Sequence, residues 1–330
     1  MLEKTCEYHG KNPLFGIKKG TAFEWITFDE FHHSVKKTRT VLQSFKLEKN
    51  NKVALISNNR WEWAAVAYAT MGLGGQIVPM YEAQLESDWQ YILQDSGTKV
   101  LVVSTEKIYE IVKEYNTSKK IGKIQTILCL DAPADKPHSL QYWLNKVDEK
   151  ALVPTSPNIT EDDVATIIYT SGTTGKPKGV ELTHRNISTN ILGLKSLLKA
   201  EMGRKVSLAF LPWAHVFGQV NELHTFISTG SSLAIVPHRD QLLECIQIVK
   251  PTALFSVPIM LNKIYDGIMK GVKQQSFIKR SIFKLALRVA RKRNHKKEYG
   301  QPVSSLLEWQ FQLFDRIVFS KVRERLGGRV

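Results

Sequence analysis

Residues 169–180 of the sequence read YTSGTTGKPKGV. The stretch combines glycines, hydroxyl side chains and two lysines, and backbone N–H groups, hydroxyls and amines are the groups with which proteins hold phosphate. A P-loop would need the spacing G-x-x-x-x-G-K-[ST], with a helix beginning near the lysine. Here Gly172 is too close to Gly175, and Pro177 follows Lys176. The sequence therefore predicts a flexible phosphate-binding loop of another kind, whose glycines permit close approach of the backbone.

The flanks of this loop predict its place in the fold. Residues 164–170, VATIIYT, have the character of a strand, and residues 181–190, ELTHRNISTN, turn into a helix. The loop is therefore expected where a strand ends and the chain turns back, which is the edge at which open α/β sheets bind ligands.

The same alternation of helix and apolar strand extends outward in both directions. Thr27 and Glu30 have the spacing of a capping box at the start of a helix. Strands are expected at 52–57, 76–81, 99–104, 124–130, 206–211, 231–236 and 252–257, and helices at 61–72, 87–97, 186–198 and 240–249 and in the residues before Gly230. Repeated βα units with almost continuously apolar strands predict an α/β fold, with mostly parallel sheets and helices on both faces. Residues 153–163 contain two prolines in a polar run and predict a subdomain boundary.

The composition restricts the partners and the setting. Lys and Arg outnumber Asp and Glu by 46 to 31 in the 330 residues, so acidic partners such as nucleotides, coenzymes or anionic lipid head groups are favoured. Three distant cysteines, Cys6, Cys129 and Cys245, fit neither a disulfide framework nor a metal-ligand spacing. No stretch has the pattern of a signal peptide or of a membrane span. We therefore expect a cytoplasmic protein.

The loop YTSGTTGKPKG resembles the signature loop of the adenylate-forming (AMP-binding) superfamily, which includes acyl-CoA synthetases, adenylation domains of peptide synthetases and luciferases. The resemblance implies that the loop holds the β and γ phosphates of ATP while a carboxylate attacks the α phosphate and pyrophosphate leaves. A loop that must release pyrophosphate is expected to be mobile. The resemblance assigns the polyphosphate to Thr170, Ser171, Gly172, Thr173, Thr174, Gly175, Lys176 and Lys178, and it makes Thr170 the candidate Mg²⁺ ligand.

A second motif supports the same family. Residues 211–218, LPWAHVFG, resemble the P-x-x-H-x-x-G motif near the acyl and adenylate site, which makes His215 the candidate catalytic residue beside the bound carboxylate. His184 and Asn186 also match the family, although a role at a helix start explains them equally well.

Within the family, the A-H-V-F context and a long insertion at 269–325 most resemble the long-chain fatty acyl-CoA synthetases. The resemblance implies a ligase that uses ATP and Mg²⁺ to activate a fatty acid and then transfers the acyl group to CoA. Two alternatives stay open: another adenylate-forming ligase, acting on an aryl or amino acid, and a non-catalytic membrane-surface or interaction protein derived from a synthetase.

The insertion is strongly basic between residues 270 and 297, where Lys and Arg occur without any acidic residue. The pattern predicts a cationic amphipathic helix. Its apolar face is expected to hold Ile278, Ile282, Leu285 and Val289, and its opposite face Lys284, Arg288 and Arg291. The segment either packs on the domain with a solvated basic face or makes peripheral contact with an anionic membrane. Nucleic acid is not expected, because few aromatic residues interrupt the charges.

The resemblance covers the whole chain, but several later family motifs have no counterpart in it. The Y-G-x-T-E segment with its Mg²⁺-binding Glu, the ribose-binding Asp and the catalytic Lys of the C-terminal domain do not occur before Val330. Residues 1–330 are thus expected to form an incomplete N-terminal domain of the adenylate-forming fold, without the C-terminal domain. We expect this chain alone to be inactive.

Overall fold

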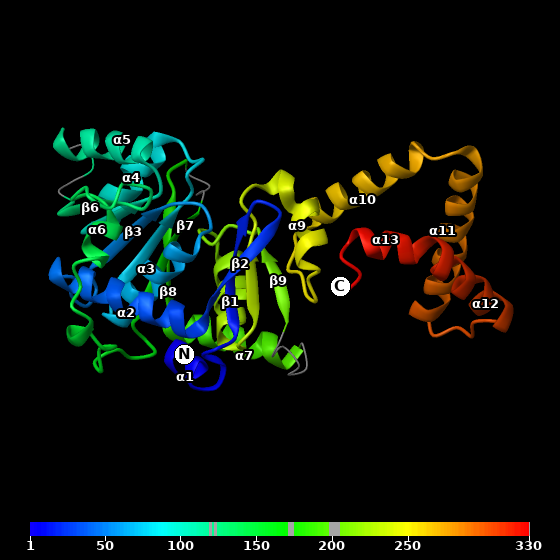
Figure 1. The fold of residues 1–330 in the computed structure, drawn as a ribbon, viewed down its shortest axis with the longest axis horizontal. Helices are drawn as coiled ribbons and strands as arrows, with labels where there is room; N and C mark the ends of the chain where they lie inside the picture. Colours follow the sequence, from blue (N-terminus) through cyan, green and yellow to red (C-terminus); the bar gives the residue numbers. More distant parts are fainter. Residues whose placement is uncertain (119–120, 122–123, 171–174, 198–204, 330) are drawn as a thin grey trace. The chain divides into compact units, whose positions relative to one another are not determined.

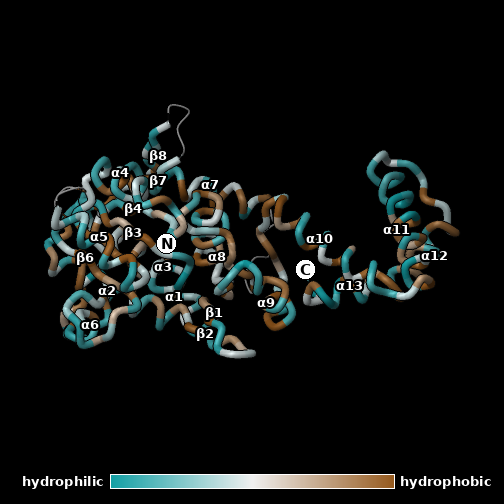
Figure 2. The backbone as a smooth tube through the Cα atoms, turned by 90° about the horizontal axis from the view of Figure 1, so that it is seen from above, coloured by the Kyte–Doolittle hydropathy of each residue, from teal (hydrophilic) through white to brown (hydrophobic). Residues whose placement is uncertain are grey.

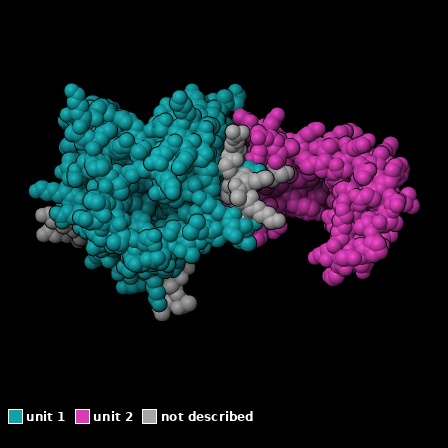
Figure 3. Space-filling model, turned by 90° about the horizontal axis from the view of Figure 1, so that it is seen from below, with its two compact units in different colours: residues 1–205, 209–237 teal, residues 206–208, 238–330 magenta. Residues whose placement is uncertain are grey.

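The computed structural model describes residues 1–118, 121, 124–170, 175–197 and 205–329. The chain divides into two compact units (Figure 3). Unit 1 contains residues 1–205 and 209–237, and unit 2 contains residues 206–208 and 238–330. Unit 1 carries the loop and the second motif, and unit 2 carries the basic insertion.

The largest sheet has six strands in the order β6-β5-β3-β4-β7-β8 (Figure 1). Its strands are β3 (Lys52–Ile56), β4 (Gln76–Met80), β5 (Val100–Val103), β6 (Thr126–Cys129), β7 (Val164–Thr170) and β8 (Lys178–Thr183). All neighbouring pairs are parallel except β7 and β8, which form an antiparallel hairpin. The fold class expected from the sequence is confirmed.

Both faces of this sheet are covered, which explains why its strands are almost continuously apolar. The helices of this part are α2 (Phe28–Ser44), α3 (Trp61–Gly72), α4 (Glu86–Ser96), α5 (Glu106–Thr117) and α6 (Leu140–Leu144), with a short 3₁₀ turn η1 (Glu149–Ala151). Ile92 of α4 and Val112 of α5 belong to the same buried cluster as Ala54 of β3. Val53 and Leu55, which point to the opposite face, are also fully buried.

A second sheet has the order β2-β1-β10-β9. Its strands are β1 (Pro13–Lys19), β2 (Ala22–Thr27), β9 (Val206–Ala209) and β10 (Ser232–Ile235). The antiparallel β1–β2 hairpin was not expected from the sequence. The associated helices are α1 (Leu2–His9), α7 (His184–Leu197), the π-helix η2 (Phe217–His224) and α8 (Thr225–Ser228).

An aromatic cluster joins the helices of the first sheet to the second sheet within unit 1. Phe15 of β1 contacts Phe31 of α2 with ring centroids 5.0 Å apart, and Trp213 lies 5.8 Å from Phe15 and 5.7 Å from Trp63 of α3. All four side chains are fully buried. Trp213 belongs to the second motif, so the motif is anchored in the core of unit 1.

The capping box at Thr27 is confirmed. The Thr27 backbone N–H donates to Glu30 Oε2 at 2.7 Å, and the Glu30 N–H donates to Thr27 Oγ1 at 3.2 Å. This reciprocal pair satisfies N–H groups at the start of α2.

Unit 2 is mostly helical. Its elements are η3 (Arg239–Gln241), α9 (Leu242–Val249), α10 (Pro258–Lys273), α11 (Phe277–Glu298), α12 (Ser305–Phe314), η4 (Asp315–Phe319) and α13 (Ser320–Arg325). Helix α11 is largely hydrophilic along its length (Figure 2). Arg293 of α11 forms a bidentate ion pair with Glu308 of α12 at 2.7 and 2.8 Å and lies 4.0 Å from the Phe311 ring centroid, which holds these two helices together.

Two expectations from the sequence were wrong. Residues 252–257 form no strand, because Thr252 N and Ala253 N both donate to the same oxygen, Val206 O, instead of continuing a ladder. The apolar face expected for α11 is buried only at Val289 and is otherwise exposed. The buried side chains of α11 are Phe283, Ala286 and Val289, whereas Ile278 is 70% exposed and Leu285 is 46% exposed.

Candidate functional site

The glycine-rich stretch of the first motif connects the two strands of the β7–β8 hairpin. Thr170 and Lys178 are directly opposite each other in the ladder, and both are exposed. Opposite residues of an antiparallel pair place their side chains on the same face. A hydroxyl and an amine therefore flank the loop on one side. Ser171, Gly172, Thr173 and Thr174 lie outside the described residues.

The described end of the loop has glycine where the backbone demands it. Gly175 has φ +94°, which strains any residue with a side chain. The next residue, Lys176, is exposed, and its Nζ lies 5.6 Å from the centroid of the Tyr91 ring. The amines of Lys176 and Lys178 thus both belong to the same end of the hairpin.

The stem of the hairpin is fixed to helix α4. Tyr169 donates a hydrogen bond to Asp95 Oδ2 at 2.6 Å, and burial together with this carboxylate raises the pKa of Tyr169, which keeps the phenol protonated as a donor. Opposite Tyr169, a Cβ on Gly179 would lie 2.9 Å from Ile167 Cγ2. The glycine in the sequence KPKG thus allows the side chains of β7 to pack against β8.

The second motif forms a tight turn that ends in η2. His215 N–H donates to Pro212 O at 3.1 Å, and a Cβ on Gly218 would lie only 2.4 Å from that oxygen. The pattern P-x-x-H-x-x-G therefore has a steric basis in this chain. The His215 side chain is exposed, and its Nδ1 accepts from Phe217 N–H at 3.2 Å. In the neutral imidazole the proton is consequently on Nε2.

A side chain that the sequence analysis did not select holds this turn. Asn59 Nδ2 donates to Leu211 O at 2.8 Å, and Asn59 Oδ1 accepts from Trp213 N–H at 2.9 Å. On the other side, Trp213 Nε1–H donates to Glu222 Oε2 at 3.0 Å. Burial raises the pKa of the fully buried Glu222 well above its ordinary value. The segment that leads to His215 is therefore held from both sides.

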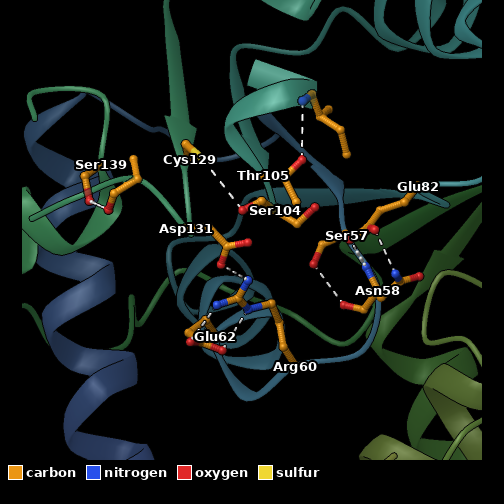
Figure 4. Close-up of polar contacts among 12 residues, drawn as sticks. Ser57, Asn58, Arg60, Glu62, Glu82, Ser104, Thr105, Cys129, Asp131 and Ser139 are labelled. Atoms are coloured by element: carbon orange, nitrogen blue, oxygen red, sulfur yellow. Dashed lines mark hydrogen bonds and ion pairs between the residues drawn. The ribbon is translucent and has the colours of Figure 1, made fainter. Parts of the chain in front are cut away.

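The residues on either side of Asn59, Asn58 and Arg60, are held by polar residues that follow the parallel strands (Figure 4). Asn58 donates through its N–H and Nδ2 to the Glu82 carboxylate at 2.8 and 2.7 Å. Arg60 pairs with Glu62 at 3.0 Å and with Asp131 at 2.7 Å. Burial would lower the pKa of Arg60, but the hydrogen bonds and charges of these two carboxylates outweigh it and raise the pKa.

These residues follow β3, β4 and β6 at one edge of the sheet, so the network fixes the β3–α3 loop before and after Asn59. The sequence contained a signal for Asn59. Asn59 comes just after an apolar strand, at the edge where ligand-binding groups gather in such sheets. Glu222 gave no such signal, because polar residues such as Gln219, Asn221 and His224 surround it in the sequence.

His184 and Asn186 occur at the start of α7. Asn186 Oδ1 accepts from Thr183 N–H at 3.0 Å, and Asn186 N–H donates to Thr183 Oγ1 at 3.1 Å. This reciprocal pattern supports the helix-start role for Asn186. His184 is partly buried, and burial lowers the pKa of its imidazole.

Within the described ranges, no cluster of three or more His, Cys, Asp or Glu side chains is arranged to bind a metal ion. None of the helices there combines the length and the apolar character needed to cross a bilayer.

Known proteins similar to this chain identify its family. The family model described as AMP-binding enzyme matches residues 2–309. The chain belongs to this family. Long chain acyl-CoA synthetase 4 of Arabidopsis thaliana is 29% identical over 100% of this chain and 51% of its own length. The rat long-chain-fatty-acid–CoA ligase ACSBG1 is 26% identical over 99% of this chain and 46% of its own. The chain thus spans about half the length of these relatives.

Solved structures of the family show the same fold. The N-terminal domain of FACL13 from Mycobacterium tuberculosis superposes with a TM-score of 0.70 at 22% identity, covering 79% of this chain and 63% of that one. ATP-bound MatB from Rhodopseudomonas palustris superposes with a TM-score of 0.65 at 22% identity, covering 79% of this chain and 50% of that one. The AMP-binding chain described here therefore has the fold of an N-terminal domain of adenylate-forming enzymes.

Proposed function

We propose that this AMP-binding chain is the N-terminal part of a long-chain fatty acid–CoA ligase. In the proposed reaction a fatty acid carboxylate oxygen attacks the α phosphorus of ATP, the bond to the β-phosphate oxygen breaks, and pyrophosphate leaves. The thiol of CoA then attacks the acyl carbon of the adenylate, giving the thioester and AMP. The relatives named above and the basic character of the chain support this proposal.

The observation that carries the proposal is the register of Thr170 against Lys178 at the mouth of the hairpin. A polyphosphate beside this face would meet a hydroxyl and an amine from the two strands and the Lys176 amine from the loop. Such fixed donors stabilise charge that develops on departing pyrophosphate. We assign Thr170 to Lys178 to the polyphosphate, including the loop residues outside the described ranges.

His215 is proposed to line the acyl site. Its exposed imidazole presents an Nε2–H donor that a substrate carboxylate can accept from, and the Asn59 clamp fixes the turn that carries it. This role requires a fixed position of the His215 backbone, which the hydrogen bonds of Asn59 to the preceding turn supply.

Mg²⁺ is the expected metal of this reaction. The exposed hydroxyl of Thr170 fits as one oxygen ligand, because Mg²⁺ commonly uses one or two protein ligands together with phosphate oxygens and water. Bound there, Mg²⁺ would neutralise phosphate charge. CoA is the proposed acyl acceptor.

The proposed setting is cytoplasmic, with peripheral contact of residues 270–297 with an anionic membrane. Helix α11 exposes Phe277, Ile278 and Leu285 among lysines and arginines, which is the composition of interfacial helices. Contact with the surface in which fatty acids partition would bring the chain close to its proposed substrate. The same exposed face also favours the non-catalytic membrane-surface alternative.

ATP–pyrophosphate exchange with a panel of acids tests the proposal. The assay would use this chain and the longest gene product that contains it. Exchange that depends on long-chain fatty acids supports the ligase, and exchange with only aryl or amino acids supports a different adenylate-forming ligase. Vesicle binding by the longest product without exchange on any acid would support the non-catalytic alternative.

A further inference from the structure

Unit 1 contains a cavity of about 410 Å³ that the proposed function does not use. It lies among α1, α2, α3, α7 and η2, and its volume is in the range of small-molecule sites. Its aliphatic walls come from Leu2, Val35, Met71, Ile187 and Ile191. Three basic or imidazole side chains, Arg39, His184 and His224, line the same space.

Two of these polar side chains are buried with unused hydrogen-bonding groups. His224 is 1% exposed; its Nδ1 is 2.9 Å from the Tyr68 hydroxyl, and its Nε2 has no partner among the described residues. Nε2 is a donor when the phenol donates to Nδ1 and an acceptor when Nδ1–H donates to the phenol, so it is an unpaired polar atom in either tautomer. A buried polar group without a partner costs about 1–3 kcal/mol, so such groups usually indicate a ligand or water.

Arg39 provides a buried cation at the same cavity. It is 3% exposed, and its guanidinium packs against Gly72, where a Cβ would lie 2.6 Å from Nε. Nη1 donates to Val153 O at 3.3 Å and lies 3.9 Å from Glu3 Oε1, whereas Nε has no partner in the described residues. The guanidinium is thus paired only loosely, although a buried charge without a close partner destabilises the fold.

The carboxylates at this cavity make their closest contacts with groups other than Arg39. Glu3 Oε1 accepts from Thr155 Oγ1 at 2.6 Å, and Glu161 pairs with Arg185 at 2.7 Å. Neither carboxylate makes a close pair with Arg39. An incoming carboxylate could therefore form the bidentate contact that guanidinium favours.

We propose that this cavity binds a small organic acid with an apolar body: the carboxylate pairs with Arg39, the hydrocarbon lies against the aliphatic walls, and the unpaired Nε2 atoms of His184 and His224 hydrogen-bond to ligand oxygen. This site is separate from the phosphate loop and from His215, and it goes beyond the proposed ligase reaction. Glu3 is the competing anion, and its negative charge lowers the affinity of the cavity for the ligand carboxylate.

Titration calorimetry on the 330-residue chain tests this site with three probes of equal length: octanoate, 1-octanol and octylammonium. Octanoate is expected to bind best. Arg39→Met is expected to lower octanoate affinity about tenfold, as for the loss of a charge-assisted hydrogen bond, and to abolish the preference over octanol. Arg39→Lys should retain part of the preference. Glu3→Gln should raise octanoate affinity, because it removes the competing charge without changing the shape of the site.

The opposite signs of the Arg39 and Glu3 variants separate binding at this cavity from a general loss of structure. Lys113→Ala, at an exposed position outside the cavity, serves as the control and should leave octanoate affinity unchanged. Absence of octanoate binding by the unmodified chain at millimolar concentration would overturn the proposal. Affinity that is unchanged in the Arg39→Met variant would also overturn it, and a simultaneous loss of affinity in His215→Ala would place the acid at the proposed acyl site.

Discussion

Asn59 Nδ2 donates to Leu211 O at 2.8 Å, across 152 positions of sequence. The same amide accepts from Trp213 N–H, so one side chain completes two hydrogen bonds of the backbone that leads to His215. Leu211 and Trp213 are buried, which leaves water little access to these groups. The contact joins the carboxyl edge of the parallel sheet to the second motif.

Replacing this side chain should therefore destabilise the motif. Asn59→Ala leaves a buried carbonyl and a buried N–H unpaired, and we expect a loss of about 1–3 kcal/mol in the free energy of unfolding. Urea unfolding measures it. Asn58→Ala is the matched control, because Asn58 is adjacent but its side chain binds the solvent-accessible Glu82. An equal effect of both variants would contradict the specific role of Asn59.

The sequence predicted the elements with the strongest local signals. Helix α3 has the expected bounds, and the strands β3, β4 and β5 lie within the expected ranges, because their apolar runs are buried on both faces. The β1–β2 hairpin was missed, since its partly exposed residues, such as Glu24, do not form a long apolar run. Helix α5 was also missed between two clear strands.

The site was predictable only in part. The loop and His215 follow from motifs, but the contact between Asn59 and Leu211 depends on tertiary structure that no local pattern encodes. For α11, periodicity indicated the helix correctly, but of the expected apolar face only Val289 is buried. The ion pair of Arg293 with Glu308 and the packing of Phe283 select the buried side, and both depend on neighbouring helices. The subdomain boundary at 153–163 stays a prediction.

Lys178→Ala should lower the rate of fatty acid adenylation by about 100- to 1000-fold in the longest gene product, as for the loss of one preorganised donor. The reason is that the amine opposite Thr170 would stabilise charge on departing pyrophosphate more than it stabilises bound ATP. Rapid-quench measurement of adenylate formation gives the rate, and fatty acid binding should change little. Lys113→Ala, at an exposed helix position, is the charge-matched control. An unchanged adenylation rate would remove Lys178 from the proposed site.

The buried His224 should make the fold sensitive to acid. Burial lowers the pKa of its imidazole from 6.5 to about 3, with a smaller contribution from His184. At His224, the unfolded chain therefore binds a proton at higher pH than the folded chain. As the pH falls from 6.5 toward 3, protonation of His224 in the unfolded chain lowers the free energy of unfolding by up to about 1.4 kcal/mol per pH unit, whereas above pH 6.5 this loss is absent.

Urea unfolding of the 330-residue chain and of His224→Gln, at pH 7 and at pH 5, measures this dependence. The variant should lose less stability on acidification than the unmodified chain. Glu222 contributes in the opposite direction, because its raised pKa favours the folded state at low pH, but it is present in both proteins and cancels in the comparison. Equal pH dependence of the two proteins would show that His224 is already accessible to protons in the folded state.

Helix α11 should bind anionic vesicles through the face that the structure leaves exposed. Phe277 and Ile278 are 75% and 70% exposed, and basic residues such as Lys284 are exposed on the same helix. Each basic residue near an anionic surface contributes about 1 kcal/mol, and salt screens it over about 8 Å at physiological ionic strength. Co-sedimentation should therefore be stronger with anionic than with neutral vesicles and should weaken as salt is raised.

The apolar contribution can be separated from the charge. Ile278→Ser should weaken vesicle binding at both low and high salt, because it removes side-chain area that enters the interface, whereas Lys284→Ala should act mainly at low salt. Leu306→Ser, an equally exposed position in α12 at 65%, is the matched control and should have little effect. Equal binding to neutral and anionic vesicles, or equal effects of Ile278→Ser and Leu306→Ser, would mean that α11 presents a solvated basic face and does not dock on membranes.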